Sequence, residues 1–150
     1  MQKISNAYGC YGQLFLRECG KKAVKVFFNR ENEGRTKDDI QAVFEAEVKA
    51  YEIAQSNVNT RDLIPTFYGV VNVCSCIDEP SRYYTDLAYE LEFLSGHFAP
   101  ISSPLISPES SSAVIELFNQ AGIDVIDSAA TYQDHHIKKV VDFTVLSQRT

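Results

Sequence analysis

The sequence predicts an α+β fold: an antiparallel sheet with one main helix, followed by a smaller part built of one helix and a β-hairpin. Two patterns carry this prediction. Short apolar runs bounded by turn residues recur along the chain, as is typical of strands, and two longer segments open with helix-start signals. A chain of 150 residues with a 45% hydrophobic content is also long enough for one domain with its own core.

A β-hairpin is expected first. The apolar runs 13–18 (QLFLRE) and 22–28 (KAVKVFF) are separated by a Cys-Gly turn at 19–20, which is a hairpin pattern. Gly9 and Gly12 lie where a turn would lead into the first of these strands.

The first helix is expected over about residues 36–55. Thr36 suits its N-cap, because Asp39 stands three residues later, where its side chain can complete a capping box. Two further strands are expected at 63–73 and 83–94, since both runs are rich in aromatic and aliphatic residues.

The segment 95–108 is rich in serine, proline and glycine, so it is expected to be a linker. The second helix should then cover about residues 109–120. Ser107 suits its N-cap, Pro108 its first position and Gly122 its end.

A second hairpin is expected where 131–133 and 138–143 flank the polar residues 134–136. We therefore expect one domain spanning all 150 residues, which the linker divides into 1–94 and 109–150.

The composition and the charge disfavour several classes of function. A net charge of −6 and a pI near 5.0 disfavour a nucleic-acid binder, which normally has a basic surface. The N-terminal residues MQKISNAYGC form no apolar signal segment, and no apolar run is long enough for a membrane span, so neither secretion nor membrane insertion is expected. Cys74 and Cys76 lack the further ligands of a zinc site, and the four cysteines follow no disulfide framework, which favours free thiols in the cytoplasm.

One acidic residue stands out in the first helix. Glu47 falls on the apolar face of the helix, together with four residues at helical spacing: Ile40, Phe44, Tyr51 and Ala54. A carboxylate on a core face needs a cation to offset its desolvation. Lys25, flanked by apolar residues on the preceding strand, is the expected partner.

A strand lysine paired with a helix glutamate is the arrangement with which protein kinases hold the phosphates of ATP. Over residues 8–144, the chain resembles the protein-kinase-like superfamily, because six segments follow the family's order. They are AVKV (23–26), EVKAYE (47–52), LIPTFYGVV (63–71), LAYELEFLSG (87–96), AGIDVID (121–127) and VVDFT (140–144).

The resemblance implies a kinase-like N-lobe over 1–94, a reduced C-lobe over 109–150, and a site for ATP and Mg²⁺. Within that site it implies one role for each of eight residues: phosphate binding for Lys25 and Glu47, the glycine-rich loop for Gly9 and Gly12, the adenine hinge for Glu92 and Leu94, the catalytic-loop aspartate for Asp127, and the metal-binding aspartate for Asp142.

The chain departs from the family pattern where catalysis needs it. The glycine-rich loop is reduced to Gly9-Cys-Tyr-Gly12, and Thr144 replaces the glycine of Asp-Phe-Gly. The expected asparagine is replaced by Tyr132 or Ala130, depending on the alignment. With few residues after Thr144, we expect no helical platform for a peptide substrate and no conventional protein kinase.

Three further groups of residues have both a chemical and a plainer structural interpretation. Asp134, His135 and His136 could bind a metal with Asp142, but such residues between two strands are more typical of a turn. The serines at 110–112 could be phosphorylated, although helix-start serines usually cap. Cys10 could act as a nucleophile, but no activating base is evident near it in the sequence.

These observations favour a pseudokinase-like module that acts by binding another protein. Its expected partner is a basic toxin, in which case the chain is an immunity protein, or a true kinase that it regulates. One alternative is a minimal ATP-dependent phosphotransferase that uses Lys25, Glu47, Asp127 and Asp142. Another is a structural α+β domain in which Lys25 and Glu47 form only a buried pair.

The expected interface is an apolar face left uncovered by the reduced C-lobe, rimmed by acids such as Glu116 and Asp127. Such a face should bind the partner or a second copy of the chain. Its expected apolar members are Leu117, Val140, Val145 and Leu146.

Overall fold

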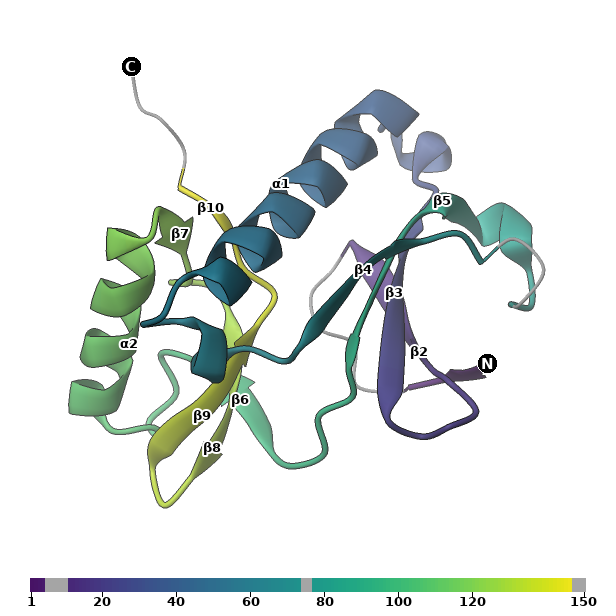
Figure 1. Ribbon diagram of the computed structural model, residues 1–150. Helices are drawn as coiled ribbons and strands as arrows, with labels where there is room; N and C mark the ends of the chain where they lie inside the picture. The colour runs from purple at the N-terminus through teal and green to yellow at the C-terminus, as the bar shows by residue number, and fades with distance from the viewer. Residues whose placement is uncertain (5–10, 74–76, 147–150) are drawn as a thin grey trace. The chain divides into compact units, whose positions relative to one another are not determined.

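The computed structural model describes residues 1–4, 11–73 and 77–146 of the chain (Figure 1). These residues form two α-helices and three antiparallel sheets, so the predicted α+β class is confirmed. Gly9 and Cys10, which the sequence placed in a glycine-rich turn, lie outside the described residues, as do Cys74 and Cys76. Neither helix in the described part of the chain is long and apolar enough to cross a membrane.

The chain divides into two compact units. Unit 1 comprises Met1–Val48 and Phe67–Phe93, and unit 2 comprises Lys49–Thr66 and Leu94–Thr150. Residues 49–66, expected in the N-terminal part, therefore group with the C-terminal part.

Unit 1 is built on a five-stranded antiparallel sheet. In spatial order the strands are β1 (Gln2–Lys3), β2 (Gly12–Leu16), β3 (Lys22–Phe28), β5 (Tyr83–Glu92) and β4 (Phe67–Val71). The expected first hairpin is confirmed as β2–β3. Its turn closes at Gly20, which has a φ of 73° and donates its N–H to the Arg17 carbonyl.

β4 is shorter than the predicted strand 63–73. The 3-10 turn η2 (Arg61–Leu63) ends where that strand was expected to begin, and Pro65, which lacks a backbone N–H, precedes β4. The other 3-10 turns in the described residues are η1 (Glu31–Glu33) and η3 (Pro80–Arg82).

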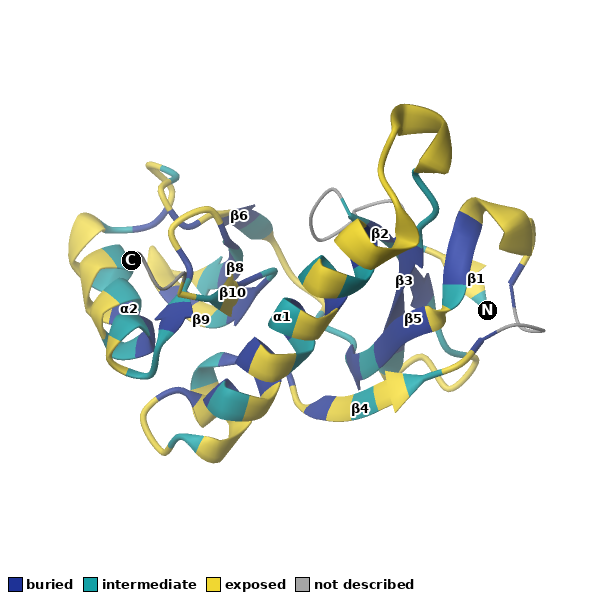
Figure 2. Ribbon diagram, turned by 90° about the horizontal axis from the view of Figure 1, so that it is seen from above, coloured by how far each residue is buried: buried dark blue, intermediate teal, exposed yellow. Residues whose placement is uncertain are grey.

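Helix α1 (Lys37–Ser56) begins at the predicted capping box. The Thr36 side chain accepts the N–H of Asp39, and the Asp39 carboxylate accepts the N–H of Thr36. The hydrogen bond from Lys37 to Asp86, 2.9 Å long, ties this end of α1 to β5 and lowers the pKa of Asp86. Figure 2 shows buried and exposed residues alternating along the helix, as the amphipathic pattern predicts.

Both faces of β3 are buried. On the face away from α1, Val24 and Val26 belong to a hydrophobic cluster. Its other buried members are Phe15, Val73, Ile77, Tyr83 and Ala88. On the opposite face, the ring of Phe27 packs edge-on against Phe44 of α1, at 5.3 Å between centroids.

Unit 2 contains helix α2 (Pro108–Gln120), which starts as predicted. Ser107 is its N-cap and accepts the N–H of Ser110, and Pro108 occupies the first helical position. Two serines of the first turn also join the helix to other segments: the Ser110 hydroxyl accepts the N–H of Ile137, and the Ser111 hydroxyl donates to the Ile101 carbonyl. These contacts give both serines a structural role.

The strands of unit 2 form two small sheets. A three-stranded sheet has the order β6 (Phe98–Pro100), β8 (Ala129–Gln133) and β9 (His136–Val141), and β7 (Ile123–Asp124) pairs with β10 (Thr144–Val145). The segment 95–108, which was expected to be a linker, contains the short strand β6, which pairs with β8. Such two- and three-residue strands are too short to show a periodic pattern.

The predicted β8–β9 hairpin is present with a tighter turn. Only Asp134 and His135 connect the paired residues Gln133 and His136, so His136 belongs to a strand. Asp134 and His135 have φ values of 53° and 67°, which suit a two-residue hairpin turn.

The end of α2 gives a first test of the fold. Gly122 follows α2 with a φ of 84° in open space, so its requirement is conformational and not steric. Gly122→Ala should lower the free energy of unfolding by about 1–2 kcal/mol, measured by urea denaturation. Gly122→Asn should cost clearly less, because asparagine adopts the left-handed conformation more readily. Equal stability of all three proteins would show that the helix ends in another way in solution.

Candidate functional site

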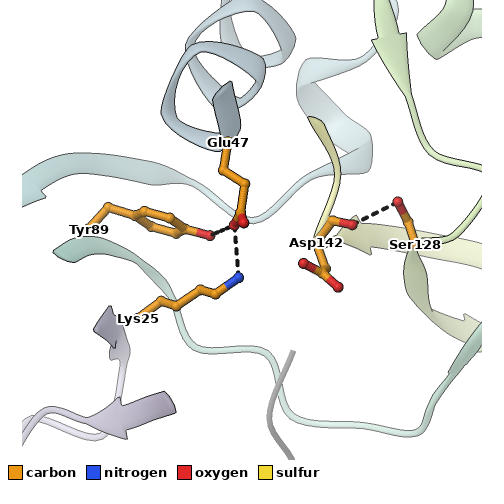
Figure 3. A network of polar contacts seen from close by, with 5 residues as sticks. All are labelled: Lys25, Glu47, Tyr89, Ser128 and Asp142. Atoms are coloured by element: carbon orange, nitrogen blue, oxygen red, sulfur yellow. Dashed lines mark hydrogen bonds and ion pairs between the residues drawn. The ribbon is translucent and has the colours of Figure 1, made fainter. Parts of the chain in front are cut away.

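The expected pair between Lys25 and Glu47 is present in unit 1. The Lys25 ammonium donates to Glu47 Oε1 over 2.8 Å, and the two side chains are 1% and 5% exposed (Figure 3). β3 supplies the lysine and α1 the glutamate, so the pair joins the sheet to the helix. The prediction that they meet in a buried setting is confirmed.

A third residue, Tyr89, completes the network. Its hydroxyl donates to the same oxygen, Glu47 Oε1, over 2.7 Å. Tyr89 lies on β5 directly opposite Lys25, so the pairing of the two strands aims both donors at one carboxylate. The sequence shows that Tyr89 is on an apolar strand, but it does not show which residue of β3 that strand places opposite it.

Aromatic rings surround the network. Tyr89 packs against three phenylalanines, with centroids 5.6 to 6.3 Å away, and the Lys25 ammonium lies 5.0 Å from the centre of one of these rings, Phe27. The three rings are those of Phe27, Phe44 and Phe67. A water-poor setting strengthens charge-assisted hydrogen bonds and makes any unpaired charge costly.

Gly12 packs against the stem of Lys25. A Cβ atom at this position would lie 2.8 Å from the Val26 carbonyl oxygen and 3.1 Å from Lys25 Cγ. β2 therefore needs a glycine here in order to approach β3, independently of any phosphate that a glycine-rich loop would bind.

The expected hinge residues lie at the end of β5. Glu92 is the last residue of the strand and pairs with Lys22, and the following residue, Phe93, donates its N–H to the Lys21 carbonyl. Leu94 is the first residue of this segment assigned to unit 2. Glu92 and Leu94 are both half-buried.

The two candidate catalytic aspartates lie in unit 2, at the same end of the β8–β9 ladder. Ala129 pairs with Val141, so Asp127 precedes this end of the ladder and Asp142 follows it. The Ser128 hydroxyl, next to Asp127, donates to the Asp142 carbonyl over 2.9 Å (Figure 3). Asp127 is exposed, and Asp142 is half-buried.

Asp142 has a left-handed backbone, with a φ of 62°. The next residue, Phe143, is buried in unit 2. The buried ring of Phe143 packs 4.4 Å from Tyr51 and 5.6 Å from Phe118, centroid to centroid. Asp134 and His135 of the β8–β9 turn share this left-handed conformation, which aspartate adopts more readily than most residues.

The residues of the expected apolar interface are only partly exposed. Val140 is fully buried, so its predicted exposure is wrong: it pairs with Ala130, and α2 packs against its strand. Leu117 and Val145 are half-buried, while Leu146 is 41% exposed.

Asp134 and His135 form a turn, and His136 is the first residue of β9. A ring nitrogen of His135 lies 3.0 Å from the Leu105 carbonyl oxygen, and the His135 carbonyl accepts the N–H of Ser107. Within the described ranges, no group of three histidine, cysteine or acidic side chains is placed to bind a metal.

Comparisons of the chain with protein-family models, with curated proteins and with solved structures find no match.

The buried network gives a stability prediction. Glu47→Ala should lower the free energy of unfolding by about 3 kcal/mol or more, because it leaves the Lys25 charge buried without its carboxylate. The double variant Lys25→Met with Glu47→Leu should recover much of that loss, since it replaces the pair with apolar groups. Denaturant unfolding of the three proteins measures both effects.

Glu45→Ala is the matched control, because Glu45 is an exposed carboxylate two residues earlier on the same helix. It should cost less than about 0.5 kcal/mol. Small, additive losses for Lys25 and Glu47 would show that the pair does not hold β3 to α1 in solution.

Proposed function

We propose that the chain is a kinase-like module that binds another protein and does not transfer phosphate. The observation that carries the proposal is the ion pair between Lys25, on the third strand of a five-stranded antiparallel sheet, and Glu47 on the helix that follows it. Protein kinases place their phosphate-binding lysine and its glutamate partner on the same two elements.

Departures from the kinase pattern support a binding role over catalysis. The glycine-rich loop is reduced to Gly9 and Gly12, and Gly12 packs against the stem of Lys25. Thr144 replaces the glycine of Asp-Phe-Gly, and the expected asparagine is missing. Both changes disfavour phosphate transfer.

The test is phosphate transfer. With labelled ATP and Mg²⁺, the chain should label neither itself nor generic protein substrates above the rate of a blank without protein. Autophosphorylation that Asp142→Asn abolishes, and that Asp134→Asn leaves intact, would overturn the proposal. Asparagine suits both positions because it tolerates a positive φ, and Asp134 provides an exposed control aspartate with a φ of 53°.

A second candidate function, a minimal ATP-dependent phosphotransferase, is favoured by one observation. Asp127 and Asp142 flank the same end of the β8–β9 ladder, where the Ser128 hydroxyl donates to the Asp142 carbonyl. In this alternative Asp142 would bind Mg²⁺ and Asp127 would act as the base. The same labelling experiment separates the two functions.

The proposed partner is basic. The chain carries 20 acidic against 14 basic residues, which favours association with a positively charged surface, such as a basic toxin or a kinase. Cysteines without a disulfide framework suit a cytoplasmic setting for such a pair.

Leu146 is the apolar anchor that we propose for this partner. It is exposed in unit 2, and the acidic residues Glu116 and Asp127 of the same unit are exposed too. Leu146→Asp should weaken binding at least about tenfold, because it places a charge in a buried apolar contact. The melting temperature should change little, since the side chain is exposed.

Leu105→Asp is the matched control, because Leu105 is a 50% exposed leucine elsewhere in unit 2. Calorimetric titration with candidate basic proteins, starting with the product of the neighbouring gene, measures the difference. Normal binding by the Leu146 variant would place the interface elsewhere.

A further inference from the structure

Sheet edges expose unpaired backbone groups, and proteins usually protect them with charges, proline or short strands. Three edges of the two larger sheets follow this rule. β1 has two residues, one of them the exposed Lys3. β6 has three residues and ends in Pro100, and β9 carries Lys138 and Lys139.

β4, the other edge of the unit 1 sheet, lacks a charged residue. None occurs between Asp62 and Asp78 in the sequence. Among the described residues, no strand pairs with the outer side of β4. The exposed large hydrophobic side chains in the described part of unit 1 are Tyr68 and Val70, 50% and 55% exposed, and both belong to β4.

We propose that β4 pairs antiparallel with β4 of a second copy of this chain, joining two five-stranded sheets into one. In a two-fold symmetric pair, the same segment of each copy lies opposite itself. Any charge on this segment would therefore face a like charge and be repelled. The neutral segment 63–77 meets that condition. A basic partner would instead be expected to meet carboxylates on this edge, and the segment contains none.

The bulge in β4 selects the register. The pairing of β4 with β5 shifts between Phe67 and Gly69, and it is regular over Gly69, Val70 and Val71. A bulge bends the strand and disturbs pairing beside it, so the second copy should align with the regular part. The two-fold axis then falls at Val70, which faces Val70 of the second copy as a β-branched pair.

The interface is small, because only a short strand contributes from each copy. Small interfaces are typical of weak, transient association. We expect a dissociation constant on the order of 10–100 μM. Sedimentation velocity at micromolar to millimolar protein concentrations can measure association in this range.

Introducing a positive or a negative charge at position 70 gives the decisive test. Val70→Lys and Val70→Glu should each weaken self-association at least about tenfold, because the axis sets like charges face to face. An equimolar mixture of the two variants should associate at least as tightly as the wild type, since opposite charges then meet. Only a contact of position 70 with itself predicts this pattern.

Val58→Lys is the control, because Val58 is a 67% exposed valine in unit 2. It should leave self-association unchanged, and circular dichroism should show that all variants are folded. The proposal is overturned if the wild type stays monomeric up to 1 mM, a concentration on the order of ten times the weakest expected dissociation constant. It is also overturned if both Val70 variants dimerise normally, or if their mixture does not associate.

Discussion

The carboxylate of Glu47 constrains unit 1 because it is an acid on the core face of a helix. It is acceptable there only while Lys25 and Tyr89 donate to it, so β3, α1 and β5 must lie in the one arrangement that brings the three residues together. A one-residue slip of either strand would turn a donor to the opposite face of the sheet. Apolar packing alone tolerates small shifts and exchanges, whereas this network does not, so it specifies the register of the sheet and the rotation of the helix.

The sequence predicts the features that depend on residues close together in the chain or on an evident need for a partner. The α1 capping box, the α2 start at Ser107 and the turn at Gly20 depend on residues within a few positions of one another, and these were predicted correctly. The Lys25–Glu47 pair was predicted because each charge lay on an apolar face and needed the other. Tyr89 was missed, because its place depends on how two distant strands pair.

The features that the sequence does not predict depend on contacts between distant parts of the chain. The exposure of Val140 was predicted from the small number of residues that follow it, yet α2 and a neighbouring strand cover it. β6, β7 and β10 have two or three residues each, and they exist only because a partner strand supplies hydrogen bonds. Burial of one residue by a distant element, like the pairing of a short strand, is a tertiary property that a local pattern does not contain.

The turn between β8 and β9 bears on the order of folding. A two-residue hairpin turn with positive φ at both positions forms most easily when asparagine and glycine occupy it. In this chain Asp134 and His135 occupy the turn instead. The turn is held instead by the segment before α2, through Leu105 and Ser107. We therefore expect the β8–β9 hairpin to be unformed in the folding transition state and to consolidate late, after α2 and the segment before it have docked.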